Sequence, residues 1–461
     1  CVDTCTTDSL NMSKEYIYAN DDPDKFYFLP RKTWEGEEVE MGWQKDEVSN
    51  LLDLERVHME HQDPEERKSS FVEIVKGYSQ EFAQLEAARC VECGVCTSSC
   101  PVQMHIPEYI HSIWNNDIES GLKQIYETNP LPGVCGRVCT HNCETACSIA
   151  VKGEAIAIRW LKRYIIDSAP EEMYKEIISE PVSEVIDAKV AVVGAGPAGL
   201  GAAYYLGAMG YKVEVFEEMP EAGGVMRYGI PAYRLPDNAI DKDIDFIESI
   251  GVKIHTNTRV GKDITMDQLE KEFDSVFLGT GFFKPRALNI PGADHEDVIG
   301  AMAFLPQVRE FERGNLKLED INIKESIVVI GGGDVAFDVA RSATRLQMLK
   351  YGKSDVKLTS LENEDALPAS MDELIEGGEE GIEFFCGNGP QEVMIKKGKV
   401  TGLRLLKCLC IFDDTGAFNP EFDNECEQII NGKQVYIAIG QSPDYDYIPE
   451  SLQDKIEIAR G

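Results

Sequence analysis

The sequence is poor in positive charge, with 45 lysine and arginine side chains against 81 aspartate and glutamate side chains among 461 residues. The formal charge of −36 excludes nucleic acid as the default partner, because an acidic surface repels a phosphate backbone. Long hydrophobic runs are also missing. The most apolar stretch, Val190–Gly210, holds six glycines and a proline and therefore predicts no membrane span.

A recognisable signal peptide is lacking too, because no basic stretch near the start is followed by an apolar run. The chain starts with Cys1 rather than methionine, from which we expect a processed product or a fragment of a longer polypeptide. The length predicts about three domains at roughly 150 residues each.

Cysteine is abundant, with fourteen residues of which eight lie between Cys90 and Cys147. Grouped cysteines in a large chain predict metal or redox sites rather than a disulfide framework, so we expect a reducing, cytoplasmic compartment. We interpret Cys1 and Cys5 as a broken half-site or as inert thiols. The remaining four, expected to be small buried hydrophobes, are Cys386, Cys408, Cys410 and Cys426.

Composition divides the chain into segments. Residues 1–65 are charged and rich in Asp-Pro turns, which predicts an extended acidic arm. Residues 66–185 show helical periodicity, with helices expected over Phe71–Ala88 and Ile156–Ile166. From Lys189 onward, short β-branched strands alternate with glycine turns and helices, which is the pattern of doubly wound α/β domains.

The first cysteine group has the spacing Cys90-x2-Cys93-x2-Cys96-x3-Cys100-Pro101, which is that of bacterial two-cluster ferredoxins. Three closely spaced thiolates can converge on one [4Fe–4S] cube, while the fourth cysteine ligates a second cube. Structural zinc is the alternative. The second group, Cys135-x3-Cys139-x3-Cys143-x3-Cys147, supplies the further ligands, since eight cysteines suffice for two cubes.

Two strand–glycine–helix units predict two nucleotide sites. Gly194-x-Gly196-x-x-Gly199 follows a strand and opens a helix, and Glu217 ends the next strand, where it can accept a hydrogen bond from a ribose hydroxyl. The alternative for Glu217 is an ordinary surface charge. Gly331-x-Gly333-x-x-Ala336 repeats this glycine motif. Asp334, directly after Gly333, is a further candidate nucleotide-binding residue.

The second unit is expected to be inserted into the first. Val276-Phe-Leu-Gly-Thr-Gly281 closes one set of strands before Ile327, and a similar strand resumes at Val435. Gly281 ends such a closing strand, where a bound nucleotide would pass. Two different nucleotides beside iron–sulfur clusters suggest a flavin and a nicotinamide, because a flavin can split electron pairs.

These residues resemble the family of the small subunit of NADPH-dependent glutamate synthase, over about positions 65–445. That family includes the N-terminal half of dihydropyrimidine dehydrogenase and flavin subunits of electron-bifurcating transhydrogenases. The motifs that carry the resemblance are Glu86-Ala-x-Arg-Cys90, Cys100-Pro-Val, Ile106-Pro, Asn129-Pro-Leu-Pro, Cys135-Gly-Arg-Val-Cys139, Cys143-Glu-x-x-Cys147, Gly223-Gly224, Tyr228-Gly-Ile-Pro and Tyr233-Arg-Leu-Pro.

The resemblance implies a helical two-cluster module at 66–185, an FAD-binding domain at 186–300 and 430–461, and an NAD(H)-binding domain at 301–429. It implies that FAD is bound by Gly194, Gly196, Gly199, Glu217 and Gly224, and the nicotinamide nucleotide by Gly331 and Gly333. It further implies crossed ligation, with one cluster on Cys90, Cys93, Cys96 and Cys147 and the other on Cys100, Cys139 and Cys143.

Two departures from the family pattern follow from the same comparison. Where relatives complete the second cluster with Glu or Gln, this chain has Lys162, and an ammonium cannot ligate iron, so Cys135 is the candidate replacement. The chain also stops at Gly461, before a segment that closes over FAD in the family, which leads us to expect an incomplete flavin site.

We therefore expect a flavin and iron–sulfur oxidoreductase subunit that moves electrons between a nicotinamide nucleotide and partner redox subunits. The rivals are a dedicated glutamate synthase small subunit and a non-catalytic electron relay with a decayed nicotinamide site. No catalytic acid or base is named, because the cofactors supply the chemistry.

The nicotinamide is expected to be NADH. Relatives that use NADPH place two arginines after the strand that begins at Val356, and the register set by Leu367-Pro368-Ala369 puts Leu361 and Glu362 there. A carboxylate accepts from a free ribose hydroxyl and repels a 2′-phosphate. Glu362 as a solvated turn residue is the alternative, and Lys353 is near enough in sequence to rescue phosphate binding.

Overall fold

The computed structural model describes residues 54–151, 153–178, 185–449 and 452. These residues form two compact units: the first contains 54–60 with 75–178, and the second contains 61–74 with the chain from 185. Most of the predicted acidic arm, with Cys1 and Cys5, lies outside the described residues, and so does the end of the chain from 453. Among the described residues, no helix is both long and apolar enough to cross a membrane.

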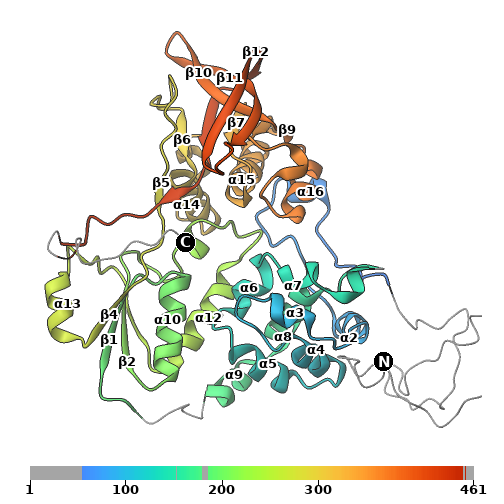
Figure 1. The fold of residues 1–461 in the computed structure, drawn as a ribbon, viewed down its shortest axis with the longest axis vertical. Coiled ribbons are helices and arrows are strands. Elements are labelled where there is room, and N and C mark those ends of the chain that lie inside the picture. Colours follow the sequence, from blue (N-terminus) through green and yellow to red (C-terminus); the bar gives the residue numbers. More distant parts are fainter. Residues whose placement is uncertain (1–53, 152, 179–184, 450–451, 453–461) are drawn as a thin grey trace, which may run out of the picture. The chain divides into compact units, whose positions relative to one another are not determined.

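The first unit consists of helices (Figure 1). Side-chain caps fix where several of them begin: the Ser79 hydroxyl accepts from the Phe82 amide at the start of α2 (Gln80–Ala88), and the Asp117 carboxylate accepts from the Ser120 amide at the start of α5 (Ile118–Tyr126). The other helices are α3 (Val95–Ser99), α4 (Ile106–Trp114), α6 (Pro132–Val138), α7 (Asn142–Thr145), the 3₁₀ helix η3 (Ser148–Val151), α8 (Ile158–Ser168) and α9 (Glu171–Ile178).

The helix expected over Phe71–Ala88 is wrong in its first half. Only Gln80–Ala88 is helical, and residues 61–74, which include the short helix α1 (Pro64–Arg67), belong to the second unit. There the Ile74 amide donates to the Tyr233 carbonyl at 3.0 Å, and the Phe71 ring packs edge-on against Phe311. These apolar side chains pack against a distant part of the chain, which local periodicity cannot distinguish from a helical face. The second expected helix is present as α8.

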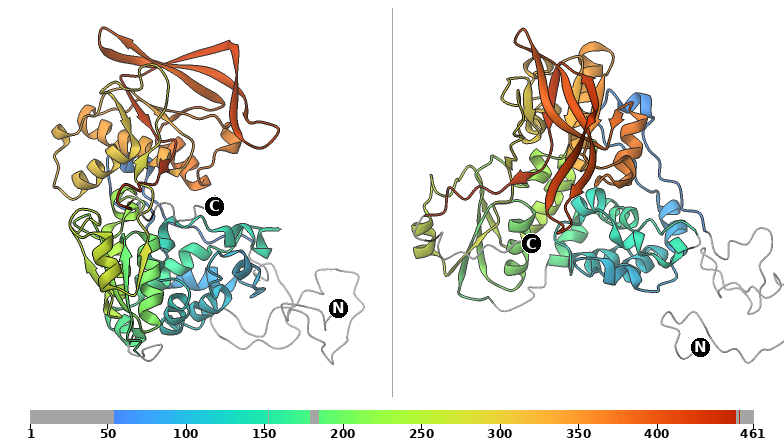
Figure 2. Two further views of the ribbon diagram at one scale, coloured as in Figure 1. Left: turned by 60° about the vertical axis from the view of Figure 1, so that its left-hand side comes forward. Right: turned by 45° about the horizontal axis from the view of Figure 1, so that its top comes forward.

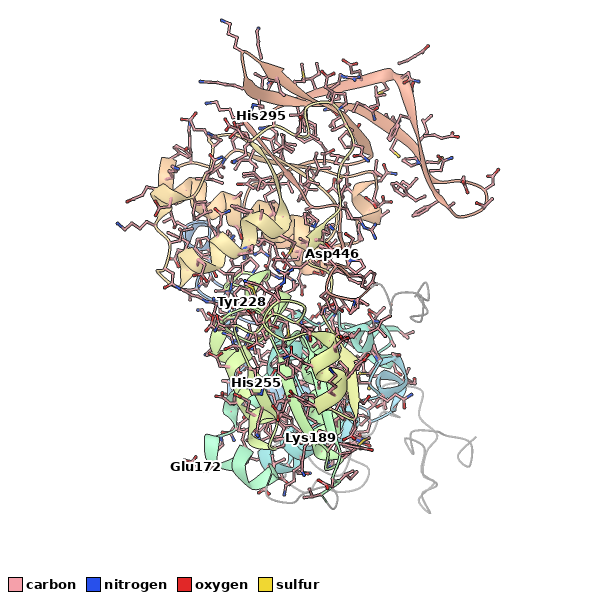
Figure 3. The ribbon with its side chains drawn as sticks, turned by 90° about the vertical axis from the view of Figure 1, so that its left-hand side faces the viewer. Glu172, Lys189, Tyr228, His255, His295 and Asp446 are labelled. Carbon is pink, nitrogen blue, oxygen red and sulfur yellow. The ribbon has the colours of Figure 1, made fainter. Side chains whose placement is uncertain are left out.

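The second unit starts with a parallel sheet of order β3-β2-β1-β4. Its strands are β1 (Lys189–Val193), β2 (Lys212–Phe216), β3 (Lys253–His255) and β4 (Ser275–Leu278), and its helices are α10 (Pro197–Ala208), α11 (Val225–Tyr228), α12 (Asp237–Ser249) and α13 (Met266–Glu272). Figure 3 shows Lys189 at the amino end of this sheet and His255 at the opposite, carboxyl end. In α/β sheets ligands bind at the carboxyl ends of the strands.

A second parallel sheet has the order β6-β13-β7-β8-β9. Its strands are β6 (Val298–Gly300), β7 (Ile327–Ile330), β8 (Val356–Thr359), β9 (Glu383–Phe385) and β13 (Gln434–Ile437). The helices around it are α14 (Ala301–Glu312), α15 (Asp334–Tyr351), α16 (Met371–Glu379) and the 3₁₀ helices η4 (Leu318–Asp320) and η5 (Glu364–Ala366). The two sheets with their helices confirm the predicted α/β class with two nested nucleotide-binding folds.

One strand assignment is wrong. We expected the strand at Val435 to resume the first domain, but β13 pairs with β6 and β7 of the second sheet. The chain leaves the first domain through β5 (Lys284–Pro285) and returns to it through β14 (Gln441–Ser442). These two strands pair antiparallel. Tyr447 then packs against the hydrophobic core of the first sheet. The inserted domain thus completes its own sheet before the chain returns.

An antiparallel sheet in the inserted domain was not predicted. It consists of β10 (Asn388–Lys396), β11 (Lys399–Phe412) and β12 (Phe418–Asn431). Figure 2 shows these long strands beside the five-stranded sheet. Leu403, Leu405 and Ile430 share a buried core with Val328 and Val435, so one face of the hairpin covers the second parallel sheet.

Candidate functional site

Four cysteines of the first unit line one pocket. They are Cys90, Cys93 and Cys96, around the start of α3, and Cys147, which precedes η3. Gly94 caps α3 with φ of +73°, a left-handed conformation that glycine adopts without strain and that turns the short loop. These are the four residues that the family resemblance assigns to one cluster, so the fold brings the predicted ligand set together.

The pocket suits a multi-iron cluster. Its other lining side chains are mostly apolar, including Pro107, Ile110, Ile156 and Ile158, and the Ser148 hydroxyl lies 3.0 Å from the Cys93 sulfur. Among the described residues, no three His, Cys, Asp or Glu side chains are arranged to hold a single metal ion. Four thiols around a largely apolar space can hold a cube, in which each thiolate binds a different iron.

Burial favours the protonated thiol at two of these cysteines, Cys90 and Cys96. It raises the pKa of Cys90 to about 12 and that of Cys96 to about 11. Thiolates rather than thiols ligate iron, so binding of a cluster releases these protons.

The second cysteine group gathers around Cys143 in α7. Burial raises the pKa of Cys143 to about 12, and the charged or titratable groups acting on it are Glu144, Lys162, Cys139 and Cys100. Cys139 is the C-cap residue of α6, and Cys100 is the C-cap residue of α3. Both expected partners therefore act electrostatically on Cys143 from the ends of neighbouring helices. Arg159 donates to the Cys139 carbonyl at 3.3 Å.

Cys135 lies within α6, four residues before Cys139, and residues with that spacing share one helix face. Its role as a ligand stays a prediction. Lys162, on α8, is buried with 5% of its surface exposed.

The first nucleotide site is a cavity of about 350 Å³ beside the first sheet. Gly194 and Glu217, both predicted for FAD, and Gly281, predicted to lie where a nucleotide passes, all line it. Gly224 packs directly on the loop, since a Cβ on it would stand 2.8 Å from the Gly196 Cα. A Cβ on Gly199 would stand 1.8 Å from the Gly194 carbonyl oxygen, which explains the need for glycine where α10 meets β1.

Glu217 is not an ordinary surface charge. It is 6% exposed, and its Oε2 accepts from the Ala195 amide inside the glycine loop at 2.7 Å, while Oε1 accepts from the Met219 amide at 2.9 Å. Burial raises the pKa of Glu217, and these backbone hydrogen bonds oppose the rise.

Sequence reasoning missed several residues of this cavity, because they come from loops and from the returning chain. Lys284 and Tyr447 come from the two crossings between the domains, and the Tyr447 hydroxyl lies 3.2 Å from the Thr280 hydroxyl. No motif in the sequence marks them. The other missed lining residues include Thr258, Arg259 and Val260.

The second glycine loop has the same construction. Gly331 has φ of +144°, and a Cβ on it would stand 2.3 Å from the carbonyl oxygen of Ala438 in the neighbouring chain segment. Gly333 caps α15, and a Cβ on it would meet open space. The Asp334 carboxylate accepts from the Ser370 amide at 2.8 Å, so it orders the loop before α16.

Glu362 lies beside this loop, as Glu217 does beside the first. A Cβ on Gly332 would stand 3.3 Å from Glu362 Oε2, and the half-buried Glu362 follows the carboxyl end of β8. Lys353, by contrast, precedes β8 and acts electrostatically on Glu325, which precedes β7. Lys353 lies before the amino end of β8, and Glu362 lies after its carboxyl end. The expectation that Lys353 could rescue phosphate binding is therefore wrong.

The C-terminal cysteines are less buried than expected. Cys386, Cys408 and Cys410 are partly exposed and Cys426 is exposed, so the interpretation of all four as buried hydrophobes is wrong. Cys408, Cys410 and Cys426 lie on the unpredicted antiparallel sheet β10-β11-β12. The outer part of this sheet has no covering layer among the described residues. All twelve described cysteines are free thiols.

Two family models match the chain. Residues 67–174 match dihydropyrimidine dehydrogenase domain II with its 4Fe-4S cluster, and residues 188–461 match the pyridine nucleotide-disulphide oxidoreductases. The division between the matches agrees with the change from the helical segment to the α/β domains.

Several curated relatives are similar to this chain over most of its length. The NADP(+)-dependent formate dehydrogenase subunit beta of Moorella thermoacetica is 34% identical, over 79% of this chain and 53% of the relative. The NADPH-Fe(3+) oxidoreductase subunit beta of Geobacter sulfurreducens is 35% identical, over 77% and 52%. The glutamate synthase [NADPH] small chain of Escherichia coli is 32% identical, over 86% and 84%. This chain spans about half the length of the first two relatives and most of the third.

Proposed function

The chain belongs to the glutamate synthase small-chain family of pyridine nucleotide-disulphide oxidoreductases, and from this we propose that it moves electrons between a nicotinamide nucleotide, FAD, two [4Fe–4S] clusters and a partner subunit. The resemblance inferred from its motifs is thereby confirmed. The observation that carries the proposal is the pocket in which Cys90, Cys93, Cys96 and Cys147 meet, because these are the four thiols that the family resemblance assigns to one cluster.

FAD, when bound, accepts electron pairs from a nicotinamide and releases electrons one at a time, which is the chemistry that joins the two kinds of carrier. The chain's own residues supply binding and orientation. The glycines of the first loop leave room for a pyrophosphate at the start of α10, and Glu217 orders that loop through the Ala195 amide. Gly331, Gly333 and Glu362 provide the equivalent surface for the second nucleotide.

We infer that the nucleotide is NADH, although the relatives' names specify NADP(+) or NADPH. Glu362 stands at the loop with its carboxylate towards Gly332, where it can accept from a ribose hydroxyl. Leu361 beside it offers no charge to a 2′-phosphate, and Lys353 lies at the other end of β8.

The test of the function is analysis of the holoprotein, purified anaerobically. We expect about eight irons and one FAD per chain, and EPR signals of two reduced clusters after chemical reduction. Stoichiometric zinc with no reducible cluster would refute the proposal.

The glutamate synthase small subunit remains the second candidate, because this chain covers 84%, 84% and 79% of three such small chains. That role requires a partner that hydrolyses glutamine. Glutamine-dependent glutamate formation by the purified native complex would favour it, whereas redox subunits without such activity would favour the broader electron-transfer role, including electron bifurcation.

The relay without a nicotinamide site has less support. In a decayed site, position 331 would no longer need to be glycine. Gly331 nevertheless has a positive φ and lies close to the Ala438 carbonyl oxygen, which is the geometry of a nucleotide-binding loop. Stoichiometric reduction by NADH separates a reductase from a relay.

A further inference from the structure

Lys162 occupies an unusual position for a lysine. It is on α8 and is 5% exposed, and its ammonium acts electrostatically on the Cys143 sulfur. The same sulfur is influenced by Cys139 and Cys100. The geometry agrees with this. Arg159, three residues before Lys162 on α8, donates from its guanidinium to the Cys139 carbonyl at 3.3 Å and from its amide to the Glu144 carboxylate at 2.8 Å. This face of α8 therefore lies beside the second cysteine group.

The other charges nearby do not neutralise this ammonium. Glu144 also acts on Cys143, but its Oε2 pairs with Arg56 at 2.9 Å and its Oε1 accepts from the Arg159 amide at 2.8 Å. Among the ion pairs of the described residues, none includes Lys162. A buried ammonium without a carboxylate is costly, so the site is built for a negative group that is not a side chain of the described protein.

The first cluster pocket has a different character. Its lining around Cys90, Cys93, Cys96 and Cys147 is mostly apolar, with Ser148 as a polar side chain, and includes no lysine or arginine. The Glu92 carboxylate acts electrostatically on Cys90, and it pairs with His111. A carboxylate therefore acts on a thiol of each group, and the buried lysine is what distinguishes the second group from the first.

We propose that the Lys162 ammonium is a positioning charge that raises the reduction potential of the cluster on Cys100, Cys139 and Cys143. Addition of one electron makes a thiolate-ligated cluster more negative, and a fixed cation in a low-dielectric site stabilises that reduced form. Lys162 does not ligate iron in this role. The inference rests on the proposed two-cluster function.

The test is a redox titration of the holoprotein, monitored by EPR, with Lys162→Gln and Lys162→Arg compared. Lys123→Gln is the matched control, because Lys123 is in the same unit, is half-exposed and pairs with Glu119 at 2.6 Å. We expect Lys162→Gln to make one midpoint potential more negative by at least about 59 mV. For one electron, this corresponds to a change of about tenfold in the reduction equilibrium constant. Lys162→Arg and Lys123→Gln should leave both potentials unchanged.

Unchanged potentials in Lys162→Gln with full iron content would overturn the proposal, and so would an equal shift in Lys162→Arg. If Lys162→Gln loses the second cluster, Lys162→Arg decides: retention of both clusters at unsubstituted potentials supports the charge, and loss in both variants contradicts it. Failure of the two-cluster function itself is distinguishable, because it would appear as missing irons in the unsubstituted protein.

Discussion

Arg345 Nη1 lies 2.7 Å from Glu380 Oε2, and neither side chain is exposed to solvent. Glu380 also pairs with Arg341 at 2.8 Å and with Arg67 at 3.0 Å. Arg67 comes from the segment 61–74, whereas Arg341 and Arg345 lie on α15, so one carboxylate ties the segment that precedes the cluster module to the helix of the second nucleotide loop. The Tyr233 ring stacks on the Arg345 guanidinium at 3.8 Å.

Glu380→Gln is expected to destabilise the protein by about 3–5 kcal/mol, because it leaves buried guanidinium groups without their counter-charge. Chemical denaturation monitored by circular dichroism measures the effect. The control is Glu65→Gln, which breaks the exposed pair with Lys68 on the same segment and should cost less than about 1 kcal/mol. Equal losses in both variants would contradict the account.

The same carboxylate predicts a pH dependence. Burial favours its protonation, but the guanidinium groups of Arg341 and Arg345 outweigh burial and lower the pKa of Glu380 from 4.5 to about 2. A lowered folded-state pKa means that the stabilisation is complete above pH 4.5 and is lost as the pH falls towards 2. In Glu380→Gln this part of the acid sensitivity should disappear.

Gly199→Ala is expected to weaken FAD binding, because its methyl group would meet the Gly194 carbonyl oxygen at 1.8 Å and push α10 off the loop. Overpacking of this kind costs about 1–3 kcal/mol. Gly201→Ala on the same helix is the control, since a Cβ there meets nothing within 4 Å. Flavin content after gel filtration should fall in the first variant only.

Leu361→Arg with Glu362→Arg is expected to shift the ratio of kcat/KM towards NADPH, because two guanidinium groups would replace a carboxylate that repels the 2′-phosphate. Steady-state reduction of a flavin-linked dye with each nucleotide measures the ratio. Lys353→Ala should leave it unchanged, since Lys353 lies at the other end of β8. A higher kcat/KM for NADPH in the unsubstituted protein would refute the NADH assignment.

Cys147→Ser and Cys143→Ser are expected to remove one cluster each, with a loss of about four irons per chain in either case. Their EPR spectra should differ, because each variant retains the other cluster. Cys426→Ser replaces an exposed thiol on the hairpin and should keep the full iron content. Loss of the same EPR signal in Cys147→Ser and Cys143→Ser would contradict crossed ligation.

Cys135→Ser tests the replacement ligand of the second cluster. If the Cys135 thiolate binds iron there, the variant should resemble Cys143→Ser in iron content and EPR spectrum. A Cys135→Ser protein with two unaltered clusters would show that another group completes the cube.

Local motifs were predictable from sequence because each needs only a few neighbouring residues. The glycine loop at Gly194 is marked by glycines that directly follow β1, and the loop at Cys90 by the turn at Gly94. Glu217 and Glu362 could be placed because each follows the strand after its glycine loop. The residue types that mark these loops are close in sequence, even though the backbone that Gly194 approaches, at Gly279, is distant.

Pairings between distant segments were not predictable. The strand at Val435 resembles a closing strand of either domain, and only its hydrogen bonds to β6 and β7 decide between them. The segment from Phe71 has helical periodicity, yet its side chains pack on Tyr233 and Phe311. The relation of Lys353 to Glu362 likewise depends on which end of β8 each occupies, and a distance in sequence does not give it.

The most direct test of the central claim is an anaerobic titration of the holoprotein with NADH, monitored by flavin absorbance and cluster EPR together. The account predicts that NADH bleaches the flavin and that the EPR signal of at least one [4Fe–4S] cluster rises with it. If neither flavin nor cluster responds to NADH or NADPH, while a chemical reductant still reduces both, the chain does not take electrons from a nicotinamide and the account is contradicted.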